Sequence, residues 1–185
     1  GIKIDDLYLG KLSKQFEKEI LGLEKEIYQC AGAEFNIQSP KQLSEILFTK
    51  MQCPIVKRTK SGISTDEEVL TTLSENYEIA TLVLQYRGKT KLKSTYIDAL
   101  LDLQDKSNRV HTSYMQTATA TGRLSSNSPN LQNIPIKTED GKKIRRAFIA
   151  KEGCELVSAD YSQIELRIMA HLSKDEELLE CFHKD

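Results

Sequence analysis

The residues best suited to do chemistry lie in one short stretch of the chain, V-S-A-D-Y-S-Q-I-E-L-R. A short apolar run, expected as a strand over 155–159, ends at the carboxylate of Asp160, and a polar turn then leads into an amphipathic helix. Ligand-binding groups usually lie at such a junction of a strand with a helix. Apolar residues at every fourth position predict a buried stripe on the helix: Ile164, Ile168 and Leu172, with Met169 beside them.

Glu165 is the second carboxylate of this stretch. It could contact a ligand, or it could close a capping box with Ser162, in which the glutamate accepts a hydrogen bond from the Ser162 backbone amide. The residues alone leave both roles open.

The basic residues are concentrated in the middle of the chain, although the formal net charge is only −1. Residues 86–151 contain 13 Lys and Arg against 5 Asp and Glu, a balance of +8, whereas the remaining residues contain 13 against 22. Clustered cations gain affinity for a polyanion from phosphate neutralisation and counterion release. The distribution therefore predicts a polyanion along this part of the protein, with an ordinary solvated face as the alternative.

Within the basic middle, the segment Y-R-G-K-T-K-L-K-S-T-Y carries cations and hydroxyls that suit phosphates and sugars. The candidate phosphate- and sugar-binding residues are Arg87, Lys91, Lys93, Ser94 and Thr95. The alternative is a lysine-rich helix face that extends its ammonium groups into solvent.

A second candidate surface is the polar segment 118–135, which is too rich in turn formers for a helix or a central strand. It carries Arg123 after a glycine, followed by three amide side chains that both donate and accept hydrogen bonds: Asn130, Gln132 and Asn133. Such groups suit the minor-groove acceptors of base pairs, which look alike whatever the sequence. A plain surface loop is the alternative.

The elements that must position these groups are mainly helical before residue 108 and mixed after it. Apolar spacing and capping residues predict four helices: one capped by Asp5 or Asp6, one that begins at Ser39-Pro40, one that begins at a Thr65-x-x-Glu68 capping box, and one over 78–103 that is interrupted at Gly88 and the lysine-rich run after it. Strands are predicted at R-V-H-T-S-Y and over 147–150, so that the fold class is α+β with a boundary near residue 108.

The composition predicts a folded protein without a membrane segment, since 39% of the 185 residues are apolar. No apolar run approaches the ~20 residues needed to span a bilayer, and the N-terminal G-I-K-I-D-D lacks the order of a secretory signal. We therefore expect a cytoplasmic protein. Its four cysteines include no C-x-x-C pair, which indicates neither a zinc site nor a disulfide framework: Cys30, Cys53, Cys154 and Cys181.

Three segments together resemble the signature blocks of bacterial DNA polymerase I, the A family of DNA polymerases: T-A-T-G-R-L-S-S-N-S-P-N-L-Q-N-I-P, S-A-D-Y-S-Q-I-E-L-R-I-M-A-H-L-S and Y-R-G-K-T-K-L-K-S-T-Y. The resemblance covers nearly the whole chain. It implies a mainly helical thumb over residues 1–108 and the N-terminal part of an antiparallel-sheet palm over residues 109–185, truncated before the fingers. It implies primer-template DNA and deoxynucleoside triphosphates (dNTPs) as partners of the intact enzyme.

The resemblance also implies the roles of the carboxylates. Asp160 matches the aspartate that binds both catalytic Mg²⁺ ions, and the backbone carbonyl of Tyr161 matches the companion ligand. In such sites two metal ions stabilise the charge that develops on the attacking and leaving oxygens. Glu165 matches the side chain that crowds the sugar 2′ position, and Ser162 and Gln163 are further candidates for the nucleotide site.

The DNA-binding candidates have counterparts in the same blocks. Arg123 matches the arginine that reaches the minor groove at the primer terminus, with Asn130, Gln132 and Asn133 as its neighbours along the duplex. The basic segment around Lys91 resembles the thumb residues that hold the product duplex. Contacts of this kind set affinity and register and carry no sequence preference.

The resemblance places the fingers and a second metal-binding aspartate after the last residue of this sequence. One aspartate cannot hold two dications, so we expect the 185 residues alone to hold no stable Mg²⁺ and to be unable to polymerise. An incomplete palm sheet would expose an unpaired edge and an apolar face, which favours self-association. Two alternatives stay open: a nucleic-acid-binding module without catalysis, and a partner-binding helical domain whose basic segment is merely solvated.

Overall fold

The structure, a computed structural model, describes residues 1–60 and 62–183. The chain forms two compact units, Gly1–Ala150 and Lys151–Asp185. The first combines long helices with short antiparallel strands and the described part of the second contains two helices, so the fold class is α+β as predicted. None of the helices in the described part of the chain is both long and apolar enough to cross a membrane.

Helix α1 (Asp6–Ala31) is the longest element of the first unit. Asp5 caps it, as predicted, by accepting a hydrogen bond from the Tyr8 backbone amide at 2.8 Å. The helix ends at Gly32, whose φ of 61° is a left-handed conformation that glycine adopts at little steric cost. Its apolar face is buried: Leu9, Leu12, Phe16, Leu23 and Ile27.

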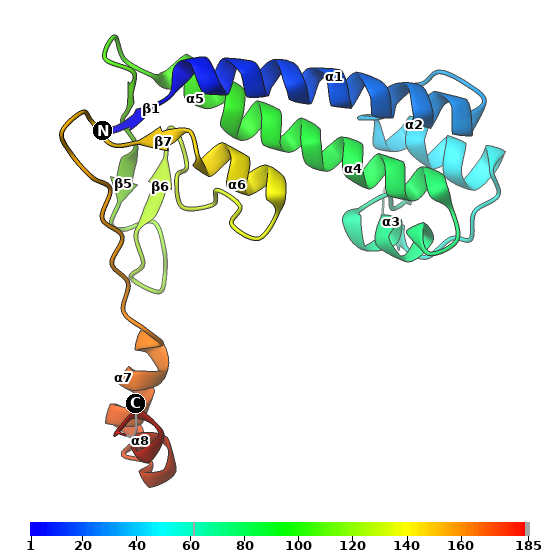
Figure 1. The fold of residues 1–185 in the computed structure, drawn as a ribbon. Helices are drawn as coiled ribbons and strands as arrows, with labels where there is room; N and C mark the ends of the chain where they lie inside the picture. The colour runs from blue at the N-terminus through cyan, green and yellow to red at the C-terminus, as the bar shows by residue number, and fades with distance from the viewer. Residues whose placement is uncertain (61, 184–185) are drawn as a thin grey trace. The chain divides into compact units, whose positions relative to one another are not determined.

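A second long helical run packs along α1 in the opposite direction (Figure 1). It consists of α4 (Glu78–Leu92), the π-helical segment η2 (Lys93–Asp98) and α5 (Ala99–Leu103). The predicted interruption at Gly88 was wrong, because lysine and leucine favour helix and one glycine costs only about 1 kcal/mol. Burial of an apolar face outweighs that cost; the buried residues are Ile79, Leu82, Val83, Tyr96, Ile97 and Leu100.

Short elements connect α1 to α4. They are α2 (Pro40–Ser44), the π-helical η1 (Glu45–Lys50), the hairpin strands β2 (Arg58–Thr59) and β3 (Gly62–Ile63), and α3 (Glu67–Ser74). Ser39 caps α2 as predicted. Helix α3 is capped by Asp66, one residue after the predicted Thr65, because the Asp66 carboxylate accepts a hydrogen bond from the Val69 amide at 3.0 Å.

The N-terminal strand joins distant parts of the first unit. Strand β1 (Ile2–Ile4) is the centre of a three-stranded antiparallel sheet, between β4 (Arg109–Val110) and β7 (Phe148–Ile149). The remaining elements are a hairpin of β5 (Ser113–Met115) with β6 (Ser125–Asn127), and α6 (Glu139–Arg145). The predicted boundary near residue 108 lies inside this compact unit, and as a division of thumb from palm it stays a prediction.

The second unit departs from the predicted strand-to-helix junction. Residues 154–160 form neither a helix nor a strand, and Val157 is 89% exposed. A strand needs the backbone groups of a neighbouring strand, and the described part of this unit contains only the helices α7 (Ile164–Ser173) and α8 (Glu176–His183). The prediction of a strand over 155–159 was therefore wrong.

The predicted buried stripe of α7 is exposed as well. Ala170 is its one buried residue, and Leu172 is 75% exposed. Helix α7 does pack against α8, where the Arg167 guanidinium lies 4.6 Å from the centre of the Phe182 ring. Spacing determines which side of a helix is apolar, but burial also requires another surface that covers the apolar side. The described residues of this unit supply no such surface for most of the stripe.

Candidate nucleic-acid interface

A groove of about 570 Å³ is lined by the α4–η2 run and by the segment 130–138, both in the first unit. The helical run contributes Lys91 and Thr95, a cation and a hydroxyl, and the polar segment contributes the amides of Asn130 and Asn133. The other lining residues are Glu67, Gly88, Leu92, Tyr96, Pro135 and Thr138. The fold therefore brings four predicted DNA-binding residues, from two segments far apart in the sequence, to one surface.

Hydrogen bonds order the polar loop that forms one wall of this groove. The Tyr96 hydroxyl donates to the backbone carbonyl of Asn133 at 2.6 Å. The Gln132 side chain accepts from the Ser126 amide at 2.9 Å through Oε1 and donates to the Leu124 carbonyl at 3.1 Å through Nε2. Gln132 is thus a support of the loop that does not line the groove, and its predicted contact with DNA stays a prediction.

Two of the predicted residues on the helical side make local interactions. The Lys93 ammonium pairs with the Asp98 carboxylate at 2.7 Å, and the Ser94 hydroxyl donates to the Thr90 carbonyl at 2.9 Å. Neither of them lines the groove. The exposed side chain of Lys91 does, so it is the cation best placed to meet a phosphate there.

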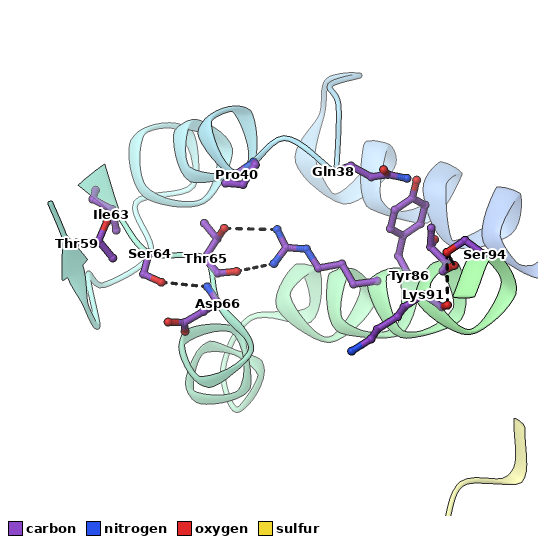
Figure 2. Close-up of a pocket in the computed structure, with 12 residues that line it drawn as sticks. Gln38, Pro40, Thr59, Ile63, Ser64, Thr65, Asp66, Tyr86, Lys91 and Ser94 are labelled. Atoms are coloured by element: carbon purple, nitrogen blue, oxygen red, sulfur yellow. Dashed lines mark hydrogen bonds between the residues drawn. The ribbon is translucent and has the colours of Figure 1, made fainter. Parts of the chain in front are cut away.

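Arg87 lines a different pocket, of about 670 Å³, beside the short elements that precede α4 (Figure 2). Its guanidinium donates to the Thr65 carbonyl at 2.5 Å and to the Thr65 hydroxyl at 3.4 Å. Burial lowers the pKa of Arg87 from its ordinary value. These contacts tie α4 to the residue that precedes the capped start of α3, which is a structural role, and a DNA contact by Arg87 stays a prediction.

Arg123 lies in the exposed loop before β6 and does not line the groove. The turn that carries it contains Gly122 at a φ of 74°, and the Thr119 hydroxyl donates to the Arg123 carbonyl at 2.6 Å. The backbone around Arg123 is therefore held locally, and its predicted minor-groove contact stays a prediction.

The five residues predicted for the metal and nucleotide site all lie in the second unit and are exposed: Asp160, Tyr161, Ser162, Gln163 and Glu165. Gln163, at a φ of 50°, is the N-cap residue of α7. Ser162 is therefore not the capping residue that the capping-box interpretation requires, and its backbone carbonyl accepts a hydrogen bond from Arg167 Nε at 3.0 Å. Glu165 lies in the first turn of the helix.

The described residues do not complete a magnesium site around Asp160. Mg²⁺ requires nearly octahedral coordination by oxygen. Asp160 offers a suitable carboxylate, but no group of three His, Cys, Asp or Glu side chains that could hold a metal ion occurs among the described residues. A stable ion would need ligands from outside this set.

Comparison with known protein families identifies the kind of protein that carries these features. The family described as DNA polymerase family A matches residues 6–185. The chain belongs to DNA polymerase family A.

Individual family A members resemble the chain over its full length. DNA polymerase I of Caldicellulosiruptor bescii is 54% identical over 183 residues, which are 98% of this chain and 22% of that protein. The thermostable DNA polymerase I of Thermus aquaticus is 52% identical over 187 residues, which are 100% of this chain and 22% of that protein. The chain thus spans about a fifth of the length of these relatives.

A solved structure agrees with the family assignment. The POL domain of Pol1 from M. smegmatis, in complex with a DNA primer-template and a dNTP, matches with a TM-score of 0.88 and 44% identity. The match covers 98% of this chain and 32% of that one.

Some residues that shape the groove of this family A chain were missed by sequence reasoning. Tyr96 is not among the predicted site residues, although a buried tyrosine usually places its hydroxyl on a partner. Thr138 caps α6, where its hydroxyl accepts from the Gly141 amide at 3.1 Å. The order Thr-Glu-Asp-Gly is a recognisable helix start, so the sequence did contain a signal for Thr138.

Proposed function

We propose that this chain is the duplex-binding part of a template-directed DNA polymerase, and that primer-template DNA lies in the groove lined by Lys91, Thr95, Asn130 and Asn133. The proposal is supported by membership of DNA polymerase family A and by the DNA primer-template and dNTP bound to the similar M. smegmatis domain. In this proposal residues 1–108 are the thumb and residues 109–185 the beginning of the palm.

The composition of the groove is the observation that carries the proposal. A lysine and a threonine hydroxyl suit the phosphates and sugars of one strand, which position the duplex. The two asparagine amides suit the minor-groove acceptors, which every base pair offers. Neither kind of contact selects a base sequence, as a polymerase requires.

Outside the groove, the remaining predicted contacts complete the proposal. Arg123 reaches the minor groove at the primer terminus, with Gln132 beside it, and Arg87, Lys93 and Ser94 stabilise the product duplex. Asp160 and the Tyr161 carbonyl are ligands of Mg²⁺, and Glu165 contacts the sugar of the dNTP, with Ser162 and Gln163 nearby. Because one aspartate cannot hold two dications, we infer that the 185 residues alone do not add nucleotides.

Salt-dependent binding of a fluorescent hairpin duplex tests the groove. The logarithm of the association constant should fall linearly with the logarithm of the KCl concentration, because binding releases counterions. Lys91→Ala should reduce that slope by about one, whereas Lys25→Ala, on the exposed face of α1, should leave it unchanged. A chain that does not bind the duplex at low salt, or a slope that is indifferent to Lys91, would contradict the proposal.

A second candidate function is a nucleic-acid-binding module without catalysis. It is favoured by the balance of +8 in residues 86–151 and by the absence, among the described residues, of a group of three side chains that could hold a metal ion. Primer extension by a longer protein that contains this chain distinguishes the two functions. If the chain only binds nucleic acid, Asp160→Ala leaves primer extension by that protein unchanged. If the chain belongs to the polymerase site, the substitution abolishes primer extension.

A further inference from the structure

Lys89 lies at the centre of a cluster of charges that connects three helices. Its ammonium is 2.5 Å from the Glu19 carboxylate of α1 and 2.8 Å from the Asp140 carboxylate of α6. It also lies 5.0 Å from the centre of the Phe16 ring, a favourable position for a cation over an aromatic face. The side chain is only 22% exposed, so the surrounding protein shields this cation from most of the solvent.

The cluster stays charged around neutral pH. Burial opposes the charge of the ammonium, but the hydrogen bonds to Asp140 and Glu19 outweigh it and raise the pKa of Lys89. Burial likewise opposes the charge of Asp140, and its bonds with Lys89 and Lys143 lower its pKa nevertheless. Removing the central cation would leave two carboxylates close together in a partly buried place, which is unfavourable.

The carboxylate of Asp140 connects this cluster to the groove. Asp140 lies in the first turn of α6. Thr138 is the capping residue of that helix. The same turn packs closely on Pro135, because a Cβ atom at Gly141 would lie only 2.5 Å from the Pro135 carbonyl oxygen. Pro135 and Thr138 both line the groove, so the position of α6 determines the position of that wall.

Lys89 lies in the helix that forms the opposite wall of the groove. It lies in α4 close to Lys91, the exposed cation that lines the groove. The link from Lys89 to Asp140 therefore joins α4, which forms one wall, to α6, which follows the other wall, and the Tyr96 to Asn133 hydrogen bond joins the two walls directly.

We propose that Lys89 is a positioning residue, which holds α6 against α4 and so sets the distance between Lys91 and the asparagines of the opposite wall. The proposal rests on the proposed function, since it assigns Lys89 an effect on duplex binding without contact with DNA. Residue 89 needs a long cation for this role, because its charge must reach carboxylates on two other helices.

The salt dependence of duplex binding separates a positioning lysine from a lysine that contacts phosphate. Lys89→Met keeps most of the side-chain length and removes the charge. It should weaken duplex binding about threefold to tenfold while leaving the slope against the logarithm of the salt concentration unchanged. Lys91→Met should reduce the slope by about one. Lys142→Met is the matched control, because this exposed lysine pairs with Glu139 within α6 and should leave both quantities unchanged.

Hydrogen exchange tests the position of α6 without DNA. Amides of residues 136–145 should exchange faster in Lys89→Met and in Asp140→Asn than in the unsubstituted chain, and Lys89→Arg should restore their protection. If Lys89→Met prevents folding, Asp140→Asn breaks the same link while Lys89 keeps Glu19 as its partner.

The outcomes are distinguishable. An unsubstituted chain that does not bind the duplex would refute the proposed function together with this inference. Normal binding by the unsubstituted chain, with unchanged affinity and exchange in Lys89→Met, would refute the positioning role alone. A reduced salt slope in Lys89→Met would show that Lys89 contacts phosphate directly and would also overturn the inference.

Discussion

The hydroxyl of Tyr96 in η2 donates a 2.6 Å hydrogen bond to the backbone carbonyl of Asn133 in the polar loop. The Tyr96 side chain is 9% exposed and its ring belongs to the core that includes Phe16 and Ile97. One residue therefore contributes both to the hydrophobic core and to the position of an Asn133 side chain that lines the groove.

Tyr96→Phe should lower the free energy of unfolding by about 1 kcal/mol, because it removes the hydroxyl and leaves the Asn133 carbonyl without this donor. Urea denaturation followed by circular dichroism measures the change. Tyr114→Phe is the control, since Tyr114 is 59% exposed and should change stability little. Equal effects of the two substitutions would show that the hydroxyl of Tyr96 is not important to the fold.

Gly141→Ala should destabilise the chain by about 1–3 kcal/mol, because the new methyl group would overlap the backbone of Pro135. Gly22→Ala in α1 should instead stabilise it by about 0.5–1 kcal/mol, since a Cβ at that helical position meets nothing within 4 Å. Both values come from urea midpoints at one pH. An alanine at residue 141 that is tolerated as well as one at residue 22 would contradict the close packing of α6 on Pro135.

The capping carboxylate of Asp66 should make stability depend on pH. The Val69 amide, the Ser64 side chain and the Lys57 ammonium together lower the pKa of Asp66 from 3.8 to about 2. A carboxyl group whose folded pKa is depressed stabilises the fold above its unfolded pKa, and this contribution is lost as the pH falls from about 3.8 toward about 2.

Asp66→Asn keeps a good capping residue but does not titrate. We expect the unsubstituted chain to be more stable than this variant at pH 6, and the difference to shrink from pH 4 downward. Urea midpoints at pH 6, 4 and 3 measure it, with Glu75→Gln at the other end of α3 as the control. A difference that stays constant over this range would refute the role of the Asp66 charge.

Asp160→Ala should leave duplex affinity of the chain unchanged within about twofold, because the proposed role of Asp160 is to bind metal and not to anchor DNA. Anisotropy titrations with and without Mg²⁺ at constant ionic strength measure the affinity. A large loss of affinity in the variant would indicate that the carboxylate, or a cation that it holds, contacts DNA directly.

Much of the first unit could be predicted from local signals. The apolar spacing of α1 and the capping residues Asp5 and Ser39 act within one or two helical turns, so the sequence indicates them directly. The continuous helix through Gly88 was not predicted, because glycine disfavours helix locally and only packing against α1 shows that this cost is outweighed.

The candidate site likewise includes residues that the sequence identified and residues whose roles only the structure showed. Residue types alone identified Lys91, Thr95, Asn130 and Asn133 as groups suited to phosphates and base edges, since hydrogen-bonding capacity and charge belong to the side chain itself. The supporting roles of Arg87 and Lys89 were not predictable, because their partners Thr65, Glu19 and Asp140 are distant in the sequence.

The sequence by itself therefore determined the chemistry that this chain offers: a basic middle, an amide-rich loop and the carboxylate of Asp160. The tertiary structure alone decided which of these groups share a surface. It also left 155–159 without the strand partners that the apolar run required. The physical reason is that charge and hydrogen-bonding capacity are properties of single residues, whereas burial, strand pairing and the width of a groove are properties of contacts between segments far apart in the chain.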